Sequence, residues 1–454
     1  MTTTKTHIEK YPAYKDSGVE WMSEIPEGWE VNRLKSKIFL LTGYPFKSDK
    51  YANIGIKLAR GINVKEGYFD WSDKRCWPEV SKELEPFLLK EGDVLIAMDG
   101  SKVGKNFCQV KEDDLPVLLL QRVARLRTKN GLLPNFLYWN IVSKSFLSWV
   151  NISKTDPMVP HIAPKDINNF IIAIPSPSEQ TAIANFLDDK TAKIDLAIAQ
   201  KEKMITLLKE RKQIIIQNAV TGKWSMINGQ WSMTPKEKLK DSGVEWIGEI
   251  RENWEVEKLF GVCRFVRGNS TFSKDELLSS GDYIALQYGK SYKVAEVDEK
   301  YEFYVNNEFY KDSQVVNHGD TIFISTSETI EDLGHSVFYK RNDLGLLGGE
   351  QMLLKPNMET VNSKYLYFSS TVFSKELRKY ATGIKVFRFN INDLKTIFTP
   401  VPPIAEQNLI VQHIELQSTK TDKAIALQKQ QIEKLKELKS TLIDSAVTGK
   451  IKVS

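Results

Sequence analysis

The sequence predicts an α+β protein with an internal pseudo-twofold repeat, in which two similar domains of mixed strands and helices are joined by two long antiparallel coiled-coil helices. The segment KDSGVEW at residues 15–21 returns at residues 240–246, and AVTGK at residues 219–223 returns at residues 446–450. The first pair lies 225 positions apart and the second 227, so the two halves differ little in length. Self-similarity over such a distance indicates one structural unit used twice.

Each half ends in a long segment of helical character. After Ser178, a suitable N-cap with Glu179 and Gln180 in the first turn, neither Pro nor Gly occurs before Gly222. That gives roughly 40 residues, or about 60 Å of helix. The second segment runs from Pro403 to a C-terminal stop at Gly449. The expected boundaries are a first domain at 1–177, a helix at 178–222, a second domain at 223–403 and a second helix at 404–454.

The apolar residues of both helices fall at heptad spacing. They are Leu187, Ile194, Ile198, Ile205, Leu208 and Ile215 in the first helix, and Ile425, Ile432, Leu435 and Leu442 in the second. A stripe this narrow, interrupted by Lys201 and Gln428, is typical of a coiled-coil seam. We expect the two helices to pack against each other, antiparallel. The alternative is that each helix packs independently on its own domain.

The middle of each half predicts mixed structure. In the first half, residues 91–104 and 114–128 resemble buried strands bounded by turns, and residues 134–150 an amphipathic helix. Residues 318–328, 346–356 and 363–383 repeat that order in the second half, and Gly-Asp precedes an apolar strand at 92–93 and at 319–320. One fold in two diverged copies is expected, and the divergence suggests that the two middles differ in what they recognise.

Composition limits the protein class. The 454 residues are 41% hydrophobic and 27% charged, which is enough apolar material for two domain cores. No run of about 18 apolar residues and no N-terminal signal pattern is present, so a cytoplasmic protein is expected. The three cysteines are far apart and are expected to be reduced and structural. A net charge of +5 is compatible with a polyanionic partner.

Catalytic and cofactor motifs are poorly matched. The segment GSKVGKN at residues 100–106 has only three residues between its glycines and ends in Asn where a phosphate loop has Ser or Thr, so a glycine-containing turn is the better account. The five histidines are scattered without HExxH, and no GxSxG elbow occurs. We therefore expect no catalytic residues, no metal and no cofactor bound by this chain.

Together these motifs resemble the specificity subunit of type I restriction-modification enzymes. The first set reads YPAYKDSGVEWMSEIPEGWEV, IPSPSEQTAIANFLD and QNAVTGK, and the second reads DSGVEWIGEIRENWEV, PVPPIAEQNLIVQHI and DSAVTGK. The resemblance covers essentially the whole chain. It implies two target recognition domains, each reading one half of a bipartite, asymmetric double-stranded DNA sequence, with the long helices setting the length of the unread spacer.

The resemblance also implies partners. The family's specificity subunit is not catalytic. It binds two methylation subunits that use S-adenosylmethionine to methylate adenine, and the full complex adds two restriction and translocation subunits that use ATP and Mg. The absence of motor, nuclease and methyltransferase motifs in this chain is consistent with that division of labour.

Candidate DNA-contacting residues are chosen by residue type and position, because Arg, Lys, Asn and Gln side chains read base edges or bind phosphates. On the strand within QRVARLRTK, Arg125 and Arg127 share one face and Arg122 lies on the other. At an offset of 227, His161 aligns with Arg388 and Ile162 with Phe389, on a loop expected to approach DNA. The candidates are Lys47, Arg60, Lys102, Lys105, Arg125, Arg127 and His161 in the first domain, and Asn269, Gln287, Lys290, Arg388 and Asn390 in the second.

Two other classes remain open from the sequence. One is a non-catalytic interaction scaffold whose duplicated helices bind a pseudo-symmetric pair of proteins and whose domains never touch DNA. The other is an enzyme fused to a coiled coil, such as a nuclease. A steep salt dependence of DNA binding separates a DNA reader from a scaffold, and Mg-dependent cleavage by the isolated chain would identify a nuclease.

Overall fold

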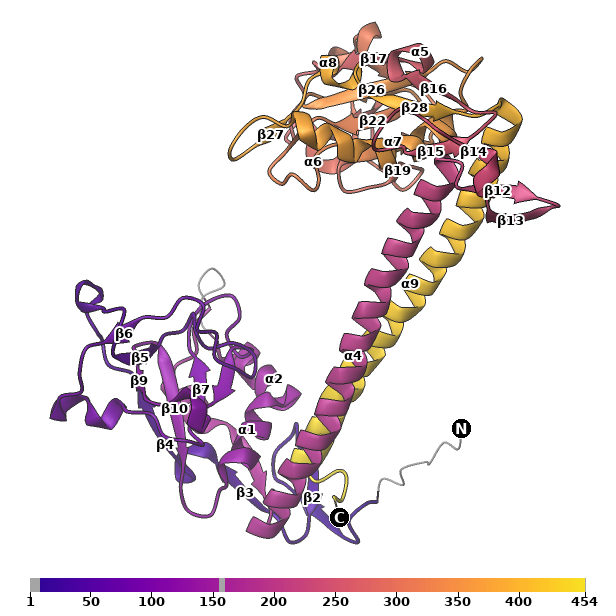
Figure 1. The fold of residues 1–454 in the computed structure, drawn as a ribbon. Coiled ribbons are helices and arrows are strands. Elements are labelled where there is room, and N and C mark those ends of the chain that lie inside the picture. The colour runs from indigo at the N-terminus through magenta and orange to yellow at the C-terminus, as the bar shows by residue number, and fades with distance from the viewer. Residues whose placement is uncertain (1–8, 155–159, 454) are drawn as a thin grey trace. The chain divides into compact units, whose positions relative to one another are not determined.

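The computed structural model describes residues 9–154 and 160–453, which form two compact units (Figure 1). The first unit contains the described residues up to Glu202 together with those from Lys429 onward, and the second contains Lys203–Gln428. Each unit therefore holds one domain and part of each long helix. Helix α4 spans Pro177–Val220 and helix α9 spans Ile404–Val447, each 44 residues long.

The first unit is built around two small sheets. A four-stranded sheet has the order β4-β10-β7-β8 and a three-stranded sheet the order β6-β5-β9, in which β5 and β9 are parallel. Its strands are β1 Tyr14–Asp16, β2 Glu24–Pro26, β3 Glu30–Arg33, β4 Ile38–Thr42, β5 Ile56–Ala59, β6 Cys76–Trp77, β7 Val94–Ala97, β8 Phe107–Gln109, β9 Val117–Leu119, β10 Val123–Thr128 and β11 Ile171–Ile174. Its short helices are α1 Pro134–Val142, α2 Lys144–Ser153 and α3 Pro164–Asn169.

The second unit repeats this plan. Its larger sheet has the order β17-β26-β22-β24-β19, and its smaller sheet has the order β20-β18-β25-β21 with β18 and β25 parallel. The strands are β12 Trp224–Ile227, β13 Gln230–Met233, β14 Leu239–Asp241, β15 Glu249–Arg251, β16 Glu255–Lys258, β17 Cys263–Arg267, β18 Tyr283–Leu286, β19 Glu296–Val297, β20 Tyr304–Val305, β21 Val315–Val316, β22 Thr321–Ile324, β23 Thr326–Ser327, β24 Ser336–Tyr339, β25 Gly345–Leu347, β26 Gln351–Pro356, β27 Phe387–Arg388 and β28 Phe398–Val401. The helices are α5 Leu259–Val262, α6 Tyr288–Ser291, α7 Ser363–Leu377 and α8 Ile391–Leu394.

The matching strand orders confirm the predicted α+β fold in two copies. Strand β10 lies between β4 and β7, as β26 lies between β17 and β22, and all four pairings are antiparallel. One expected element differs. The helix predicted over residues 134–150 is divided into α1 and α2 at Ser143, whose hydroxyl accepts a hydrogen bond from the Phe146 amide (3.1 Å) and so caps the second helix.

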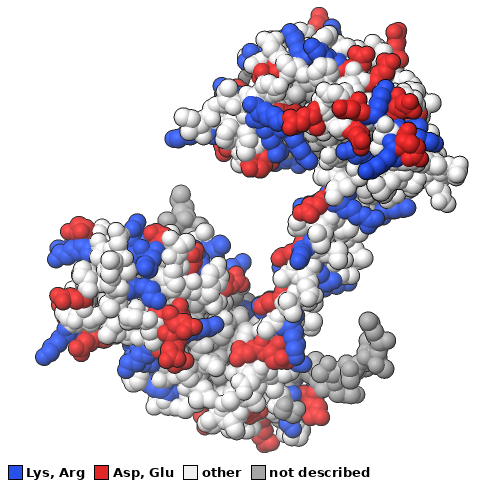
Figure 2. Space-filling model, in the orientation of Figure 1, with Lys and Arg blue, Asp and Glu red and all other residues white. Residues whose placement is uncertain are grey.

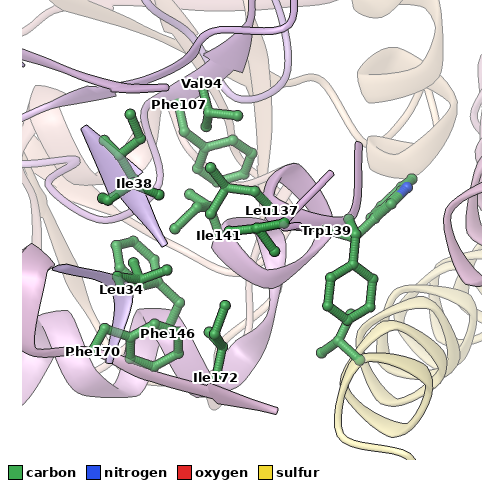
Figure 3. Packing of buried hydrophobic residues seen from close by; sticks show 14 of the residues in the cluster. Leu34, Ile38, Val94, Phe107, Leu137, Trp139, Ile141, Phe146, Phe170 and Ile172 are labelled. Atoms are coloured by element: carbon green, nitrogen blue, oxygen red, sulfur yellow. The ribbon is translucent and has the colours of Figure 1, made fainter. Parts of the chain in front are cut away.

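The core of the first unit lies between its larger sheet and helices α1 and α2. Figure 3 shows its labelled side chains, which come from the strands, from both helices and from the segment around Phe170. Phe146 of α2 meets Phe170 edge to face, with ring centroids 5.0 Å apart. The second unit has a corresponding core in which Phe323, Phe373 and Phe389 pack together.

The two long helices contact each other in antiparallel orientation, as predicted. In the first unit Asp195 of α4 pairs with Lys439 of α9 (2.7 Å), and in the second Lys212 of α4 pairs with Asp422 of α9 (2.8 Å). None of the ten residues predicted for the heptad seam is exposed. Lys201, which interrupts the seam, donates a hydrogen bond to Gln431 of the opposite helix. The alternative of two independent helices is therefore wrong.

Each long helix begins with a buried glutamine that ties it to its own domain. The Gln180 Oε1 atom accepts from the Leu133 amide (2.8 Å), and its Nε2 donates to the carbonyl oxygens of Gly131 and Pro175 (3.0 Å each). The Gln407 side chain of α9 repeats this arrangement in the second unit. The sequences SEQ at residues 178–180 and AEQ at residues 405–407 thus have a second role besides a favourable first turn. Each places a buried glutamine whose side-chain amide is hydrogen-bonded through both its oxygen and its nitrogen.

Each long helix ends on the domain of the other half, which explains why the two echoed segments occur together. Ala446 and Val447 at the end of α9 lie in the first unit's core with Trp29. Ala219 and Val220 at the end of α4 lie in the second unit's core with Trp254. The AVTGK segment of one half therefore packs on the region that follows KDSGVEW in the other half.

The glycines of these AVTGK segments are required by both space and backbone conformation. Gly449 has φ +73°, and a Cβ there would lie 2.3 Å from Pro26 Cδ. We expect Gly449→Ala to destabilise this junction by about 2–4 kcal/mol, because a strained left-handed φ adds to the overlap. Hydrogen exchange is expected to accelerate in the last turns of α9 and in residues 14–33.

The matched control is Gly229→Ala, where φ is also positive (+78°) but nothing lies within 4 Å of the added Cβ. That change is expected to cost only the conformational strain, about 1–2 kcal/mol. Equal effects of the two substitutions on local exchange would contradict the packing role of Gly449.

Within residues 9–154 and 160–453, no helix is long and apolar enough to cross a membrane, and no cluster of three or more His, Cys, Asp or Glu side chains is placed to hold a metal ion. The three cysteines are buried and free of disulfides. Burial raises the pKa of the Cys263 thiol to about 12.

Candidate nucleic-acid interface

The repeated Gly-Asp turn supplies a buried aspartate that forms an ion pair in each unit. Asp93 receives two hydrogen bonds from Arg127 of β10, 2.7 Å from Nε and 2.6 Å from Nη2. In the second unit Asp320 pairs with Lys355 of β26 (2.7 Å). Strand pairing aligns the two sites, because Leu126 faces Val94 as Leu354 faces Thr321. This ion pair is part of the shared framework, so the guanidinium of Arg127 is committed to Asp93.

Arg125 points to the interior of the same region. Its side chain is buried (6% exposed), and its Nη1 donates to the Pro86 carbonyl oxygen at 2.9 Å. Burial lowers the pKa of the Arg125 guanidinium. Residues 123–126 of strand β10 are all buried, so neither face of the strand is free there. Arg125 and Arg127, both candidates from the sequence, therefore have internal partners in this structure.

A polar cluster lies where β7 leaves the sheet of the first unit. Asp99 accepts a hydrogen bond from Arg122 Nη1 (2.9 Å) and also contacts His161 Nδ1. Residues Asp99 and His161 form a β-bridge that brings the loop before α3 against the end of β7. Arg122 stands immediately before β10 with φ +69°, and 68% of its side chain is exposed. We call these three residues the first corner cluster.

The second unit has a corresponding cluster with different chemistry. Thr326 and Arg388 pair between β23 and β27, as Asp99 and His161 do in the first unit. Glu350 stands immediately before β26 with φ +62°, accepts a hydrogen bond from the Thr326 hydroxyl, and has an oxygen 3.8 Å from Arg388 Nη2. This second corner cluster borders a cavity of about 350 Å³, which is also lined by Arg267 and by the segment 389–392.

On the side that Figure 2 shows, neither unit carries a surface of a single charge sign. Figure 2 shows Lys and Arg interspersed with Asp and Glu over the visible face. A DNA interface must therefore be argued from local donors and acceptors. The corner clusters are the strongest such candidates, because the same fold position carries charged groups in both units while the groups themselves differ.

The family assignment follows from comparison with known proteins. A family model described as the type I restriction modification DNA specificity domain matches residues 26–207 and again residues 251–437. The chain belongs to this family. Both copies of the repeat are matched, so each unit contains most of one type I DNA specificity domain.

Individual relatives agree with this assignment. Over 210 residues the chain is 32% identical to the EcoAI type I restriction enzyme specificity subunit of Escherichia coli, which covers 44% of this chain but only 33% of that subunit. The EcoBI specificity subunit of Escherichia coli is 22% identical over 408 residues, covering 88% of this chain and 81% of that subunit. The fold matches a chain from a solved structure on complex assembly and conformational transition of the type I R-M system, with a TM-score of 0.67, 16% identity, and coverage of 93% of this chain and 98% of that chain.

The remaining candidates in the first specificity domain fall into two groups. Lys47, Lys102 and Lys105 are exposed, and the two latter residues follow Asp99 on the same loop. Arg60 is committed locally, because its Nε donates to Asn63 Oδ1 (3.0 Å) and its Nη2 pairs with Asp73 (3.0 Å). The structure thus places His161, Lys102 and Lys105 on the two segments that meet at the first corner cluster. Arg60 instead stabilises its own loop through Asn63 and Asp73.

In the second specificity domain, Asn390 lies beside the corner cluster but serves as a helix cap. Its Oδ1 accepts from the amides of Asn392 (2.8 Å) and Asp393 (3.3 Å) at the start of α8. Lys290 lies over the Phe303 ring, 4.5 Å from the centroid, and Gln287 precedes α6. Asn269 is exposed, and its backbone amide donates to Gln314 Oε1 (2.8 Å).

Sequence reasoning missed Asp99, Arg122, Thr326 and Glu350 as members of these clusters. In the sequence, Asp99 follows an apolar run as an ordinary turn carboxylate does. The equivalence of Arg122 and Glu350 was also concealed, because the offset between the halves changes from 227 at β7 and β22 to 228 at β10 and β26. A residue alignment at 227 pairs Arg122 with Gly349, and only the strand register corrects it.

Proposed function

We propose that this chain is the sequence-specific DNA-binding specificity subunit of a type I restriction-modification complex. Each domain reads one half-site of a bipartite, asymmetric target. The observation that supports this most directly is the pair of corner clusters, where one shared framework presents two different sets of hydrogen-bonding groups. Two copies of one reader with different polar groups suit a target whose two halves differ.

The chemistry of modification belongs to partner subunits in this proposal. The chain itself is non-catalytic and binds no cofactor. Two methylation subunits use S-adenosylmethionine to methylate adenine, and two restriction and translocation subunits use ATP and Mg. The specificity subunit determines where these activities are directed on double-stranded DNA.

The proposed DNA contacts keep most of the residues expected from the sequence. Phosphate contacts fix position and are suited to exposed lysines, whereas base edges are read by side chains with several donors or acceptors. The proposed contacts are Lys47, Lys102, Lys105, Arg122 and His161 in the first domain, and Asn269, Gln287, Lys290, Glu350 and Arg388 in the second. Arg60, Arg125, Arg127 and Asn390 are assigned to the framework by their internal bonds.

The long helices offer a surface for the methylation subunits. Several large apolar side chains on their outer faces are exposed, although the seam between the helices is closed. They are Leu196, Leu207 and Ile214 on α4, and Leu409, Leu416, Leu427 and Leu438 on α9. Exposed apolar residues repeated along a helix are typical of a surface that another protein covers.

A genome-wide map of methylated adenine tests the proposal. Cells expressing this chain with its neighbouring methylation subunit are compared with cells that lack only this chain. The expected result is a new methylated motif made of two short half-sites around an unread gap. No chain-dependent methylation, with the subunits shown to be folded and associated, would contradict the proposal.

Salt dependence distinguishes this function from a protein scaffold. Binding of the assembled complex to target DNA is expected to weaken about 10³-fold or more between 50 and 200 mM salt, because phosphate contacts release counterions. A scaffold would show no such DNA-linked slope. Mg-dependent cleavage of DNA by the isolated chain would instead indicate a nuclease.

A further inference from the structure

Arg122 and Glu350 occupy equivalent positions in the two domains but carry opposite charges. Each is the residue immediately before an inner strand of its larger sheet, β10 or β26. The register confirms the equivalence, since each lies four residues before the strand position, Leu126 or Leu354, that pairs with the first residue of β7 or β22. A change from cation to anion at one framework position is a change in what the position can bind.

Both residues have an uncommon backbone conformation for their side chains. Five non-glycine residues have positive φ in the part of the chain that the structure describes: Ser23, Arg122, Asn130, Asn228 and Glu350. The others are short polar residues, of which asparagine tolerates this region well. A long side chain such as Arg or Glu does not stabilise a positive-φ backbone, and residues with this uncommon backbone conformation concentrate at binding sites. The conformation is therefore a feature of the corner position that both domains retain.

Each side chain is held on one side and open on the other. Arg122 uses Nη1 on Asp99 at 2.9 Å, yet 68% of the side chain is exposed, and a guanidinium carries five N–H donors. Glu350 accepts from the Thr326 hydroxyl and lies 3.8 Å from Arg388, yet 53% of its side chain is exposed. The clusters orient these groups without burying them.

Base chemistry assigns a different ligand to each group. A guanidinium donates two parallel hydrogen bonds to O6 and N7 of guanine, the commonest specific contact to a base. A carboxylate is repelled by phosphates, but it accepts a hydrogen bond from the N4 amino group of cytosine in the major groove. The adjacent Arg388 offsets the negative charge of Glu350 near DNA.

We propose that Arg122 and Glu350 are equivalent specificity-determining residues, Arg122 selecting a guanine in the first half-site and Glu350 selecting a cytosine amino group in the second. This inference rests on the proposed function and adds which base each domain reads with its corner cluster. The other explanation of the same geometry is a purely structural role, in which the cluster only holds two loops together.

The test uses the full chain assembled with its methylation subunits and maps the methylated sites for wild type, Arg122→Gln and Glu350→Gln. Arg122→Gln is expected to reduce discrimination for guanine by about tenfold or more at one position of one half-site. Glu350→Gln is expected to relax a cytosine position in the other half-site. In both variants, the remaining positions and the spacer stay as in wild type.

Matched controls are Arg33→Gln and Glu255→Gln, which remove exposed charges from β3 and β16 and are expected to leave every base preference unchanged. A second variant, Arg122→Lys, keeps the charge and the ion pair with Asp99 but lacks the guanidinium fork. Because a lysine ammonium also donates hydrogen bonds to guanine O6 and N7, this variant is expected to retain more guanine selectivity than Arg122→Gln. Equal base preferences in wild type, Arg122→Lys and Arg122→Gln would overturn the assignment of Arg122.

The failures of the two proposals are distinguishable. If the wild-type complex methylates no bipartite motif, the proposed function fails and this inference falls with it. If wild type has such a motif but the glutamine variants retain every base preference, or lose methylation uniformly without a change in preference, the specificity role is wrong and the proposed function stands.

Discussion

Exchange of residues 34–170 for the corresponding segment of a relative with a different target is expected to replace the first half-site and leave the second unchanged. The structure shows why these boundaries are suitable. Strand β3, before the segment, pairs with β11, after it, with Arg33 facing Ile171 and Glu30 facing Ile174. Both ends of the exchanged segment therefore lie next to each other, at one end of a two-stranded sheet. The graft replaces a segment that leaves and re-enters the domain at one place.

The contacts that remain across these joints favour such a graft. Gln180 binds the exchanged segment through the backbone oxygen of Gly131 and the backbone amide of Leu133, which any segment of the same fold supplies. Side-chain contacts are at risk, such as the hydrogen bond from Trp139 Nε1 to Asp188 of α4 (3.1 Å) and those that Asp444 of α9 accepts from the amide (3.1 Å) and the hydroxyl (2.6 Å) of Ser145. A serine at position 145 in the graft preserves both bonds to Asp444.

Mapping of methylated adenine with the chimaeric complex measures the outcome. The reciprocal control exchanges residues 259–397, which are bounded in the same way by the pairing of β16 with β28. It is expected to replace only the second half-site. A change in both half-sites by either chimaera would mean that the two domains do not read DNA independently, and the proposal of one half-site per domain would be wrong.

The duplicated architecture was predictable because its signals are local and repeated. The echoed segments, the absence of Pro and Gly through the long helices, and the heptad positions each depend on residues close in sequence. The structure confirms the antiparallel seam that they predicted. The crossed packing, in which AVTGK of one half lies on the domain of the other, could not be deduced because two similar surfaces offer the same kind of contact in either half.

The candidate site was less predictable because it depends on distant partners. The sequence placed Arg125 and Arg127 correctly on one strand. The alternation of side chains along an inner strand does not show, however, which of its faces is covered by the rest of the domain. Pro86, which binds Arg125, lies 39 positions earlier in the chain, and Asp93, which binds Arg127, lies 34 positions earlier. Only the folded sheet distinguishes these internal bonds from free donors.

Insertion of one heptad into each long helix is expected to lengthen the unread spacer while both half-sites stay the same. Asp195 faces Lys439 and Lys212 faces Asp422, so the junction between residues 200 and 201 of α4 faces the junction between residues 433 and 434 of α9. Seven residues inserted at both junctions keep the seam in register, since it repeats every 3.5 residues. They add about 10 Å of helix, comparable to about three base pairs of duplex.

The control places the same seven residues between Asn228 and Gly229, in the exposed turn of the β12–β13 hairpin, where Gly229 has open space around it. That insertion changes neither helix and is expected to leave the methylated motif as in wild type. The spacer is read directly from the methylated sites of each complex. An unchanged spacer in the double-insertion variant, with methylation retained, would contradict the role of the paired helices as the element that sets half-site separation. A longer spacer with both half-sites intact would separate the two functions physically, because the bases read and the distance between them would then depend on different parts of the chain.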